Sequence, residues 1–167
     1  MLVLVRSLQQ LRFGQLMNVY EESNLENGRE FYPRLPENQQ ILNAEQDFYQ
    51  YLQECFFQTE GAVYALWQEK ETYVSALRLE PYQDGFLLAA LETAPAFRKK
   101  GYASALIRAV LQLPWITRVY SHIHKQNVSS RRTHENCGFV KILDYAEYID
   151  GTVRTNSNTF VFKKTAH

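Results

Sequence analysis

The stretch "APAFRKKGYASALIRAVLQL", residues 94–113, decides how this sequence folds. It places Arg98, Lys99 and Lys100 directly before a helical pattern, although positive charge opposes the positive end of a helix dipole. A bound anion at this point would remove the conflict. The alternative is a solvated basic turn in front of an ordinary helix.

The flanks of this basic turn predict a strand–turn–helix unit. The mostly apolar run "LLAALET" (87–93) precedes it. The apolar stripe of a helix that ends before Pro114 follows it, formed by Ala103, Leu106, Ile107, Val110 and Leu111. Such a junction leaves backbone N–H groups without partners, and these groups bind phosphate. Gly101 would let the backbone approach the ligand closely. Neither the G-x-x-x-x-G-K-[ST] nor the G-x-G-x-x-G phosphate loop is present.

Outward from this unit, hydrophobic periodicity predicts alternating elements. We expect a strand at 2–5, then helices at 8–24 and 38–58 with a loop at 26–38 between them. Strands follow at 61–68, 72–79 and 85–93, and the helix after the basic turn comes next. The chain then continues through a strand at 116–124, a helix at 127–138, and strands at 139–149 and 159–163 joined by a turn at Asp150-Gly151. This order predicts one α/β (α+β) domain over residues 1–167.

Composition narrows the class of protein. The 167 residues carry 18 basic and 18 acidic side chains, so the formal net charge is zero and a nucleic acid is not an expected partner. Cys55 and Cys137 offer no disulfide framework or zinc spacing, and we expect no metal. The longest apolar runs are too short for a signal peptide or a bilayer span, which predicts a soluble cytoplasmic protein without a membrane partner.

A second motif lies downstream, in "NVSSRRTHENCGF" (127–139). "R-K-K-G-Y-A" resembles the R/Q-x-x-G-x-G/A signature of the GNAT superfamily of N-acetyltransferases. The downstream segment resembles the N-x-x-A/S-x-x-x-Y-E-x-x-G-F segment of the same superfamily, with Asn127, Ser130, Glu135, Gly138 and Phe139 in register. The two motifs stand in the order of the family, with a strand between them, and the resemblance covers residues 61–149.

The resemblance implies a mixed central sheet, mostly antiparallel and flanked by helices, whose fourth and fifth strands splay apart. Acetyl-coenzyme A (acetyl-CoA) would enter that gap as cosubstrate and bind the core at 61–149. Carried over by position, the binding residues are Leu91, Thr93, Arg98, Lys99, Lys100, Gly101, Tyr102, Ala103, Ser104, Asn127 and Ser130. Asn127 as a pure helix cap, and Ser130 as an exposed helix residue, are the alternatives.

The implied reaction is direct attack of a primary amine on the acetyl group. The family usually supplies a tyrosine to protonate the leaving thiolate, and here His134 stands in its place. A histidine can donate that proton, although a cation in the last turn of a helix also stabilises its dipole. Glu92 could act as general base through water, or pair with the basic turn. His122 and His124 share a strand face without a third metal ligand.

Residues 1–58 match no motif and form the expected acceptor side. Its carboxylates and aromatics suit a cationic amine, either a small molecule or a peptide, but solvated helix faces have the same composition. A non-catalytic regulatory module that binds coenzyme A is the alternative to an enzyme, because the tyrosine is replaced and no base is evident. The sequence leaves a homodimer open.

Overall fold

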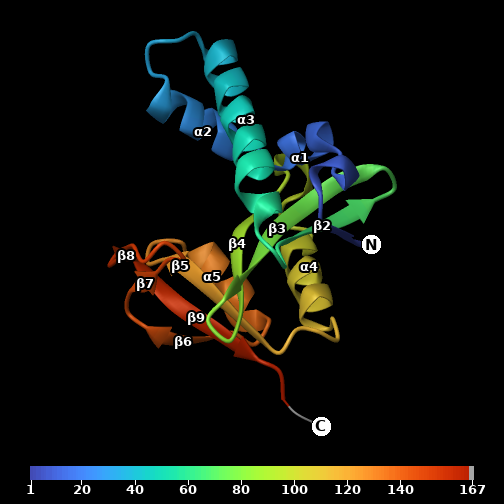
Figure 1. The fold of residues 1–167 in the computed structure, drawn as a ribbon, viewed down its shortest axis with the longest axis vertical. Coiled ribbons are helices and arrows are strands. Elements are labelled where there is room, and N and C mark those ends of the chain that lie inside the picture. The colour runs from blue at the N-terminus through green and yellow to red at the C-terminus, as the bar shows by residue number, and fades with distance from the viewer. Residues whose placement is uncertain (166–167) are drawn as a thin grey trace.

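The computed structural model describes residues 1–165. The chain begins on β1 (Leu2–Val5), an edge strand of the main sheet, and continues through three helices before it returns to that sheet (Figure 1). The remaining elements are α1 (Phe13–Val19), α2 (Glu21–Phe31), α3 (Glu37–Glu54), β2 (Val63–Glu69), β3 (Thr72–Tyr82), β4 (Gly85–Thr93), α4 (Tyr102–Leu111), β5 (Arg118–His124), α5 (Val128–Asn136), β6 (Val140–Leu143), β7 (Ala146–Glu147), β8 (Val153–Arg154) and β9 (Ser157–Lys163), with 3₁₀ turns at Leu8–Gln10, Phe56–Gln58 and Pro95–Phe97.

A seven-stranded sheet in the order β1-β2-β3-β4-β5-β9-β6 forms the centre of the molecule. Its pairs are antiparallel except for β4 and β5, which run parallel. That parallel pairing joins Phe86–Leu88 to Val119–Ser121, although both strands continue beyond it. The expected mixed, mostly antiparallel sheet flanked by helices, with its fourth and fifth strands splayed, is confirmed.

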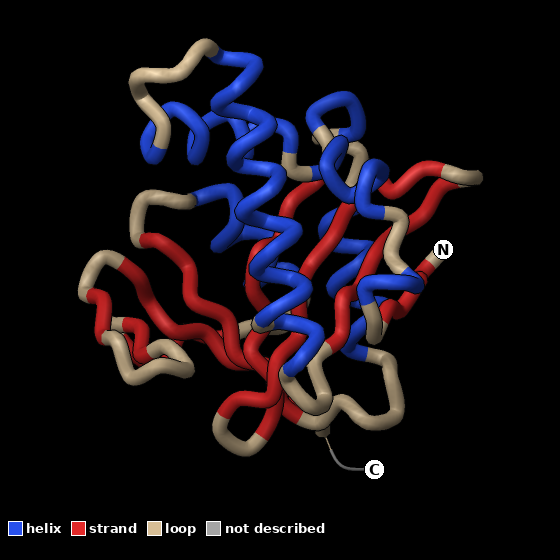
Figure 2. Tube along the Cα trace, turned by 45° about the horizontal axis from the view of Figure 1, so that its top comes forward, coloured by secondary structure: helices blue, strands red, loops and turns tan. Residues whose placement is uncertain are grey.

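Each face of the sheet packs against its own helices. Leu106, Ile107, Val110 and Leu111 of α4 are buried in one core with inward-facing residues of β2 to β5, as their spacing predicts. On the other face, Leu16 of α1, Leu52 of α3 and Phe56 are fully buried against β2 and β3. Figure 2 shows the helices lying across the strands. No helix within residues 1–165 is long and apolar enough to cross a membrane.

The N-terminal helices differ from their prediction. The expected helix at 8–24 is broken, and the expected loop at 26–38 is largely helical because α2 continues to Phe31. Gly28, within the expected loop, is buried inside α2, and a Cβ there would lie 2.6 Å from the carbonyl oxygen of Gln40 on α3. Glycine therefore permits close helix packing at this position. The predicted helix at 38–58 is confirmed as α3 and the 3₁₀ turn after it.

The C-terminal strands also differ from their prediction. The expected strand at 139–149 divides into β6, which pairs with β9, and β7, which pairs with β8 in a small separate hairpin. Gly151 does lie in the turn between β7 and β8, with a left-handed φ of 86°. The division lets β9 follow the hairpin and lie between β5 and β6.

Candidate functional site

A β-bulge in β4 shapes the site. Ala76 pairs with Glu92 while Arg78 pairs with Ala89, so β4 carries one more residue than β3 over this segment. Ala90 in the bulge has a left-handed φ of 54°, and its carbonyl oxygen accepts a 2.6 Å hydrogen bond from the Tyr20 hydroxyl. A bulge turns the following side chains relative to a regular strand. The bulge therefore changes the directions of the Leu91 and Glu92 side chains, which stand where β4 no longer pairs with β5.

A cleft of about 650 Å³, called here the splay cleft, lies between the end of β4, the turn that leads into α4, and α5. It brings together most of the residues predicted from the sequence. They are Leu91, Glu92, Thr93, Arg98, Lys99, Gly101, Tyr102, Ala103, Ser104, Asn127 and Ser130. Among the predicted cosubstrate-binding residues Lys100 is the exception, because it does not line the cleft and its ammonium lies 5.6 Å from the centre of the Phe97 ring.

The turn before α4 has the backbone geometry of an anion site. Gly101 is the N-cap residue with φ of 82°, and no side chain caps this helix end. The first-turn N–H groups therefore have no partner within the helix. A Cβ at Gly101 would meet no atom within 4 Å, which leaves open space in front of these groups. Lys99, also left-handed with φ of 61°, adds charge to the same wall. These features fit a pyrophosphate.

Arg98 lines the splay cleft and also contacts other residues of the protein. Its Nη1 lies 2.5 Å from a carboxylate oxygen of Glu22 on α2, and its Nε donates a 3.1 Å hydrogen bond to the carbonyl of Thr93. Part of the basic charge before the helix is thus balanced by an acidic residue about 76 positions away. This contact joins the basic turn to the N-terminal helices.

Glu92 lines the splay cleft near the end of β4. Burial raises its pKa to about 7, with further contributions from Glu22 and Glu26, although Arg98 opposes the rise. One carboxylate oxygen accepts a hydrogen bond from Ser23, while Oε2 is buried without a partner among the described residues. A carboxylate with this pKa changes protonation near neutral pH, as a general base must.

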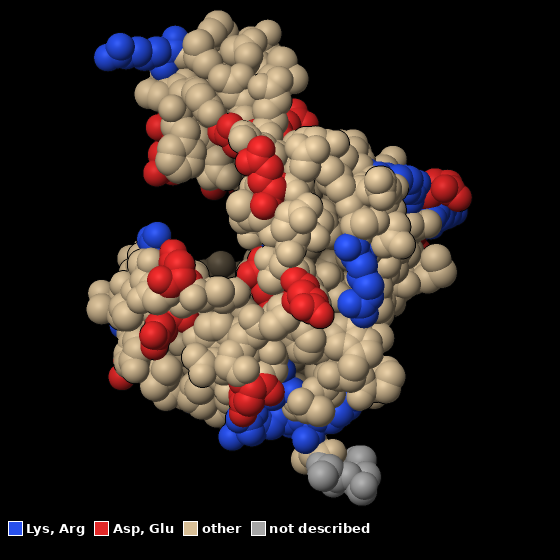
Figure 3. Space-filling model, viewed as in Figure 1, with Lys and Arg blue, Asp and Glu red and all other residues tan. Residues whose placement is uncertain are grey.

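A second cavity, of about 500 Å³, adjoins the first at Leu91 and Glu92. This helix-side cavity lies between the sheet and the N-terminal helices, and Phe48 and Tyr51 of α3 form part of its wall. Figure 3 shows the surface hollowed between the projecting helices and the body of the molecule, with acidic side chains along the border. The aromatic residues of 48–57 thus serve two purposes: Phe48 and Tyr51 line the cavity, whereas Phe56 is fully buried in the core.

His134 lies beneath the splay cleft and does not line it. Its side chain is 1% exposed and packs edge-on against Phe139, with ring centres 5.0 Å apart. Nδ1 donates to the carbonyl oxygen of Ser130 at 2.7 Å, so Nε2 is the acceptor for the Ser121 hydroxyl at 2.9 Å. Burial lowers its pKa, which keeps the ring neutral. The predicted direct proton donation by His134 does not fit this geometry, because the ring does not line the cleft and both nitrogens form hydrogen bonds within the protein.

The other polar residues of this region serve structure as well. Asn127 caps α5, accepting a 3.1 Å hydrogen bond from the Ser130 N–H, yet both residues also line the splay cleft. His122 packs between the Tyr82 and Tyr148 rings, while His124 is exposed and accepts from the Gln126 N–H. Within residues 1–165 no group of three metal-ligating side chains gathers.

Comparison with known families decides the identity. The model described as the acetyltransferase (GNAT) family matches residues 19–139, most of the chain. The chain belongs to the GNAT family of acetyltransferases. No curated protein sequence matches this GNAT acetyltransferase.

Solved structures share the fold of this acetyltransferase at low sequence identity. PaiA N-acetyltransferase from Thermoplasma acidophilum, solved in complex with coenzyme A, has a TM-score of 0.62 at 12% identity, covering 98% of this chain and 99% of its own. The ribosomal-protein-S18-alanine N-acetyltransferase of Escherichia coli gives 0.59 at 13%, covering 100% and 96%. A chimera of the Vibrio cholerae spermidine N-acetyltransferase SpeG and hSSAT gives 0.58 at 16%, covering 97% and 95%.

Sequence reasoning missed the side chains that the N-terminal helices and β3 bring to this acetyltransferase site. Tyr20, Ser23, Asn27 and Arg78 all line the helix-side cavity. Arg78 carried a usable signal, since it is a charged residue within the β-prone run 72–79. The other three stand in polar helical sequence, where nothing distinguishes them from solvated residues.

Proposed function

We propose that this protein transfers an acetyl group from acetyl-CoA to a primary amine of a small molecule or a peptide by direct attack. The observation that carries the proposal is the meeting of the splay cleft and the helix-side cavity at Glu92. The splay cleft has the backbone geometry of an anion site, and the helix-side cavity has the aromatic and acidic lining that suits an amine. The relatives named above include N-acetyltransferases, and one was solved with coenzyme A, which supports this assignment.

The residues of the splay cleft would hold the cosubstrate. Acetyl-CoA supplies the acetyl group as an activated thioester. The N–H groups at the start of α4 and the ammonium of Lys99 would bind its pyrophosphate. The backbone of Leu91–Thr93, which β5 does not pair, would bind the pantetheine arm and donate to the acetyl oxygen as charge develops there.

Glu92 is assigned as the general base. An alkylammonium ion with pKa near ~10.4 must lose a proton before it can attack. Ionised Glu92 would accept that proton, directly or through a water at its unpartnered Oε2. Its pKa of about 7 makes it a stronger base than an ordinary glutamate and still leaves it ionised above neutrality.

His134 is assigned a positioning role in place of the acid role expected from the sequence. Its hydrogen bond to Ser121 joins α5 to β5 where β4 and β5 begin to diverge, and its bond to Ser130 within α5 fixes the orientation of the ring. Loss of this tie would loosen the wall of the splay cleft formed by Asn127 and Ser130.

The test measures binding and turnover separately. Calorimetry measures the binding of acetyl-CoA, and the release of free thiol with a panel of primary amines measures acetyl transfer. We expect saturable binding and release of thiol that requires an amine. Binding without turnover on any amine would favour the non-catalytic coenzyme A module, and no binding at millimolar ligand would refute the use of the cleft.

A further inference from the structure

Arg78 brings a positive charge into the helix-side cavity. It stands on β3, two residues beyond the partner of Glu92, and both side chains line this cavity. Two residues along a strand span about 7 Å. The cavity therefore contains a guanidinium close to, but separate from, the carboxylate assigned as base.

The guanidinium of Arg78 makes no ion pair with a carboxylate within residues 1–165, although Glu80 lies near enough to act on its charge. Its Nε is buried without a hydrogen-bond partner among these residues. Its neighbours are aromatic, with ring centres of Tyr51, Phe56 and Phe48 at 4.9, 5.8 and 6.0 Å. Removing a charge from water without a partner is costly.

The tyrosine hydroxyls and the Glu80 carboxylate near Arg78 already have partners of their own. Tyr64 donates its hydroxyl hydrogen to the Tyr20 hydroxyl at 2.7 Å, and Tyr20 in turn donates to Ala90. Glu80, the nearest acidic side chain on the same strand, accepts from the Tyr51 hydroxyl at 3.2 Å and makes no ion pair with Arg78. The guanidinium is thus open to a ligand in the cavity.

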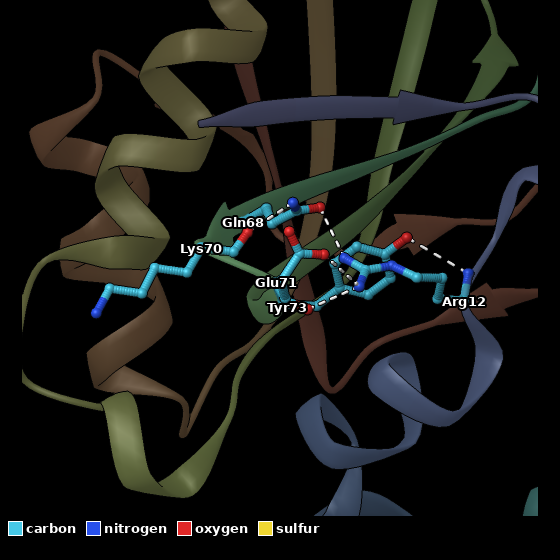
Figure 4. Close-up of polar contacts among 5 residues, drawn as sticks. All are labelled: Arg12, Gln68, Lys70, Glu71 and Tyr73. Carbon is cyan, nitrogen blue, oxygen red and sulfur yellow. Dashed lines mark hydrogen bonds and ion pairs between the residues drawn. The ribbon is translucent and has the colours of Figure 1, made fainter.

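Arg12 provides the contrast within the same molecule (Figure 4). It also stacks on a tyrosine, with its guanidinium carbon 4.8 Å from the centre of the Tyr73 ring. Its nitrogens, however, donate to the Glu71 carbonyl at 2.8 Å and to Gln68 Oε1 at 2.9 Å, and Glu71 Oε2 lies 3.5 Å away. A stacked arginine in this fold can therefore be fully partnered, and Arg78 is not.

We propose that Arg78 binds a carboxylate of the acceptor, so that the acceptor is a small molecule carrying both an amine and a carboxylate. A guanidinium matches a carboxylate with two parallel hydrogen bonds. Glu92 lines the same cavity, and this carboxylate, with Glu22 and Glu26 nearby, attracts the amine. A polyamine would instead bring a second ammonium against the guanidinium. This inference rests on the proposed function and specifies its substrate class.

Matched acceptors test the inference on the unaltered protein. γ-Aminobutyrate, butylamine and putrescine share a four-carbon chain and differ in carrying a carboxylate, a methyl group or a second amine. We expect kcat/KM at least ~10-fold higher for γ-aminobutyrate than for butylamine, the value of about one charged hydrogen bond. β-Alanine and ε-aminocaproate then report the preferred spacing. Equal or better use of butylamine or putrescine overturns the inference and leaves acetyl transfer intact, whereas no turnover on any amine refutes the proposed function itself.

The variant Arg78→Met assigns the preference to this residue. We expect kcat/KM for γ-aminobutyrate to fall ~10-fold or more, through KM, with butylamine unchanged within about twofold. Arg12→Met removes the partnered arginine and serves as control, with equal effects on both acceptors. Equal losses on both acceptors in Arg78→Met would assign Arg78 to packing. Should that variant not fold, competitive inhibition of the unaltered protein by butyrate decides, and its absence counts against the inference.

Discussion

The splay cleft and the helix-side cavity, which meet at β4, differ in the parts of the protein that define them. The features of the splay cleft that fit the cosubstrate belong to the backbone: the end of β4 that β5 does not pair, a left-handed glycine and uncapped N–H groups at a helix start. The helix-side cavity is lined by residues of α2, α3, β3 and β4, together with Tyr20 between α1 and α2. Backbone sites depend on short local motifs, whereas side-chain sites depend on distant residues that the fold brings together. The first kind suits a cosubstrate common to a family, and the second suits an acceptor particular to one member.

Glu92, which lines both cavities, gives the largest expected effect. Glu92→Gln should lower kcat by ~10²-fold or more at pH 8, because the variant can use only amine that is already neutral in solution. With ionised Glu92 as base, the rate of the unaltered protein should rise with pH and level off above about 7. The variant should keep rising toward the pKa of the amine. A pH–rate profile of both proteins checks this, and identical profiles would remove Glu92 from the reaction.

This contrast explains how far the sequence could predict the site. Gly101, the uncapped helix start and Leu91–Thr93 follow from contiguous sequence, so the splay cleft was largely predictable. The contacts of Glu92 with Ser23 and of Arg98 with Glu22 cross about 69 and 76 residues, and no local pattern encodes them. His134 matches the family position, but the short imidazole reaches Ser121 and stays in the protein interior. A motif fixes where a residue stands and not which neighbour it bonds.

The backbone side can be tested at its glycine. Gly101→Val should weaken coenzyme A binding by roughly 10- to 100-fold, because a β-branched residue is strained at φ of 82° and places methyl groups before the free N–H groups. Gly151→Val is the matched control, since Gly151 has φ of 86° and equally open space but lies in the β7–β8 turn. It should show comparable strain with unchanged affinity. Calorimetry on both variants measures this, and equal affinities would reduce the loop to a helix start.

The tie between α5 and β5 should affect stability more than chemistry. His134→Ala leaves the buried Ser121 hydroxyl and Ser130 carbonyl without their partner, which costs about 2 kcal/mol in the free energy of unfolding. The rate with saturating substrates should change by less than about fivefold, with the same pH profile. Urea unfolding and kcat provide the two measurements. A ~10²-fold loss of kcat in a variant of near-normal stability would restore the acid role.

The smallest expected effect concerns stability and pH. The pKa of Glu92 in the folded state, about 7, lies above its ordinary value of 4.5, so the folded protein holds the extra proton between these limits. Stability therefore falls as pH rises through this window. Glu92→Gln should remove that fall and be more stable than the unaltered protein at pH 8 by about 1 kcal/mol, once solvent screening is discounted. Glu60→Gln, an exposed site outside the cavity, is the control. Unfolding curves at pH 4.5 and 8 check the difference.

The short parallel pairing of β4 with β5 has a consequence for hydrogen exchange. Phe86–Leu88 and Val119–Ser121 form the ladder between the two parts of the sheet, pressed together where a Cβ on Gly85 would collide with the Arg118 carbonyl. With so little shared ladder, β5, β9 and β6 should open together as a cooperative unit, below the free energy of global unfolding. A ligand in the splay cleft would bridge both parts. Amide protons of β5 should then exchange more slowly when coenzyme A is bound, while those of β2 exchange only through global unfolding.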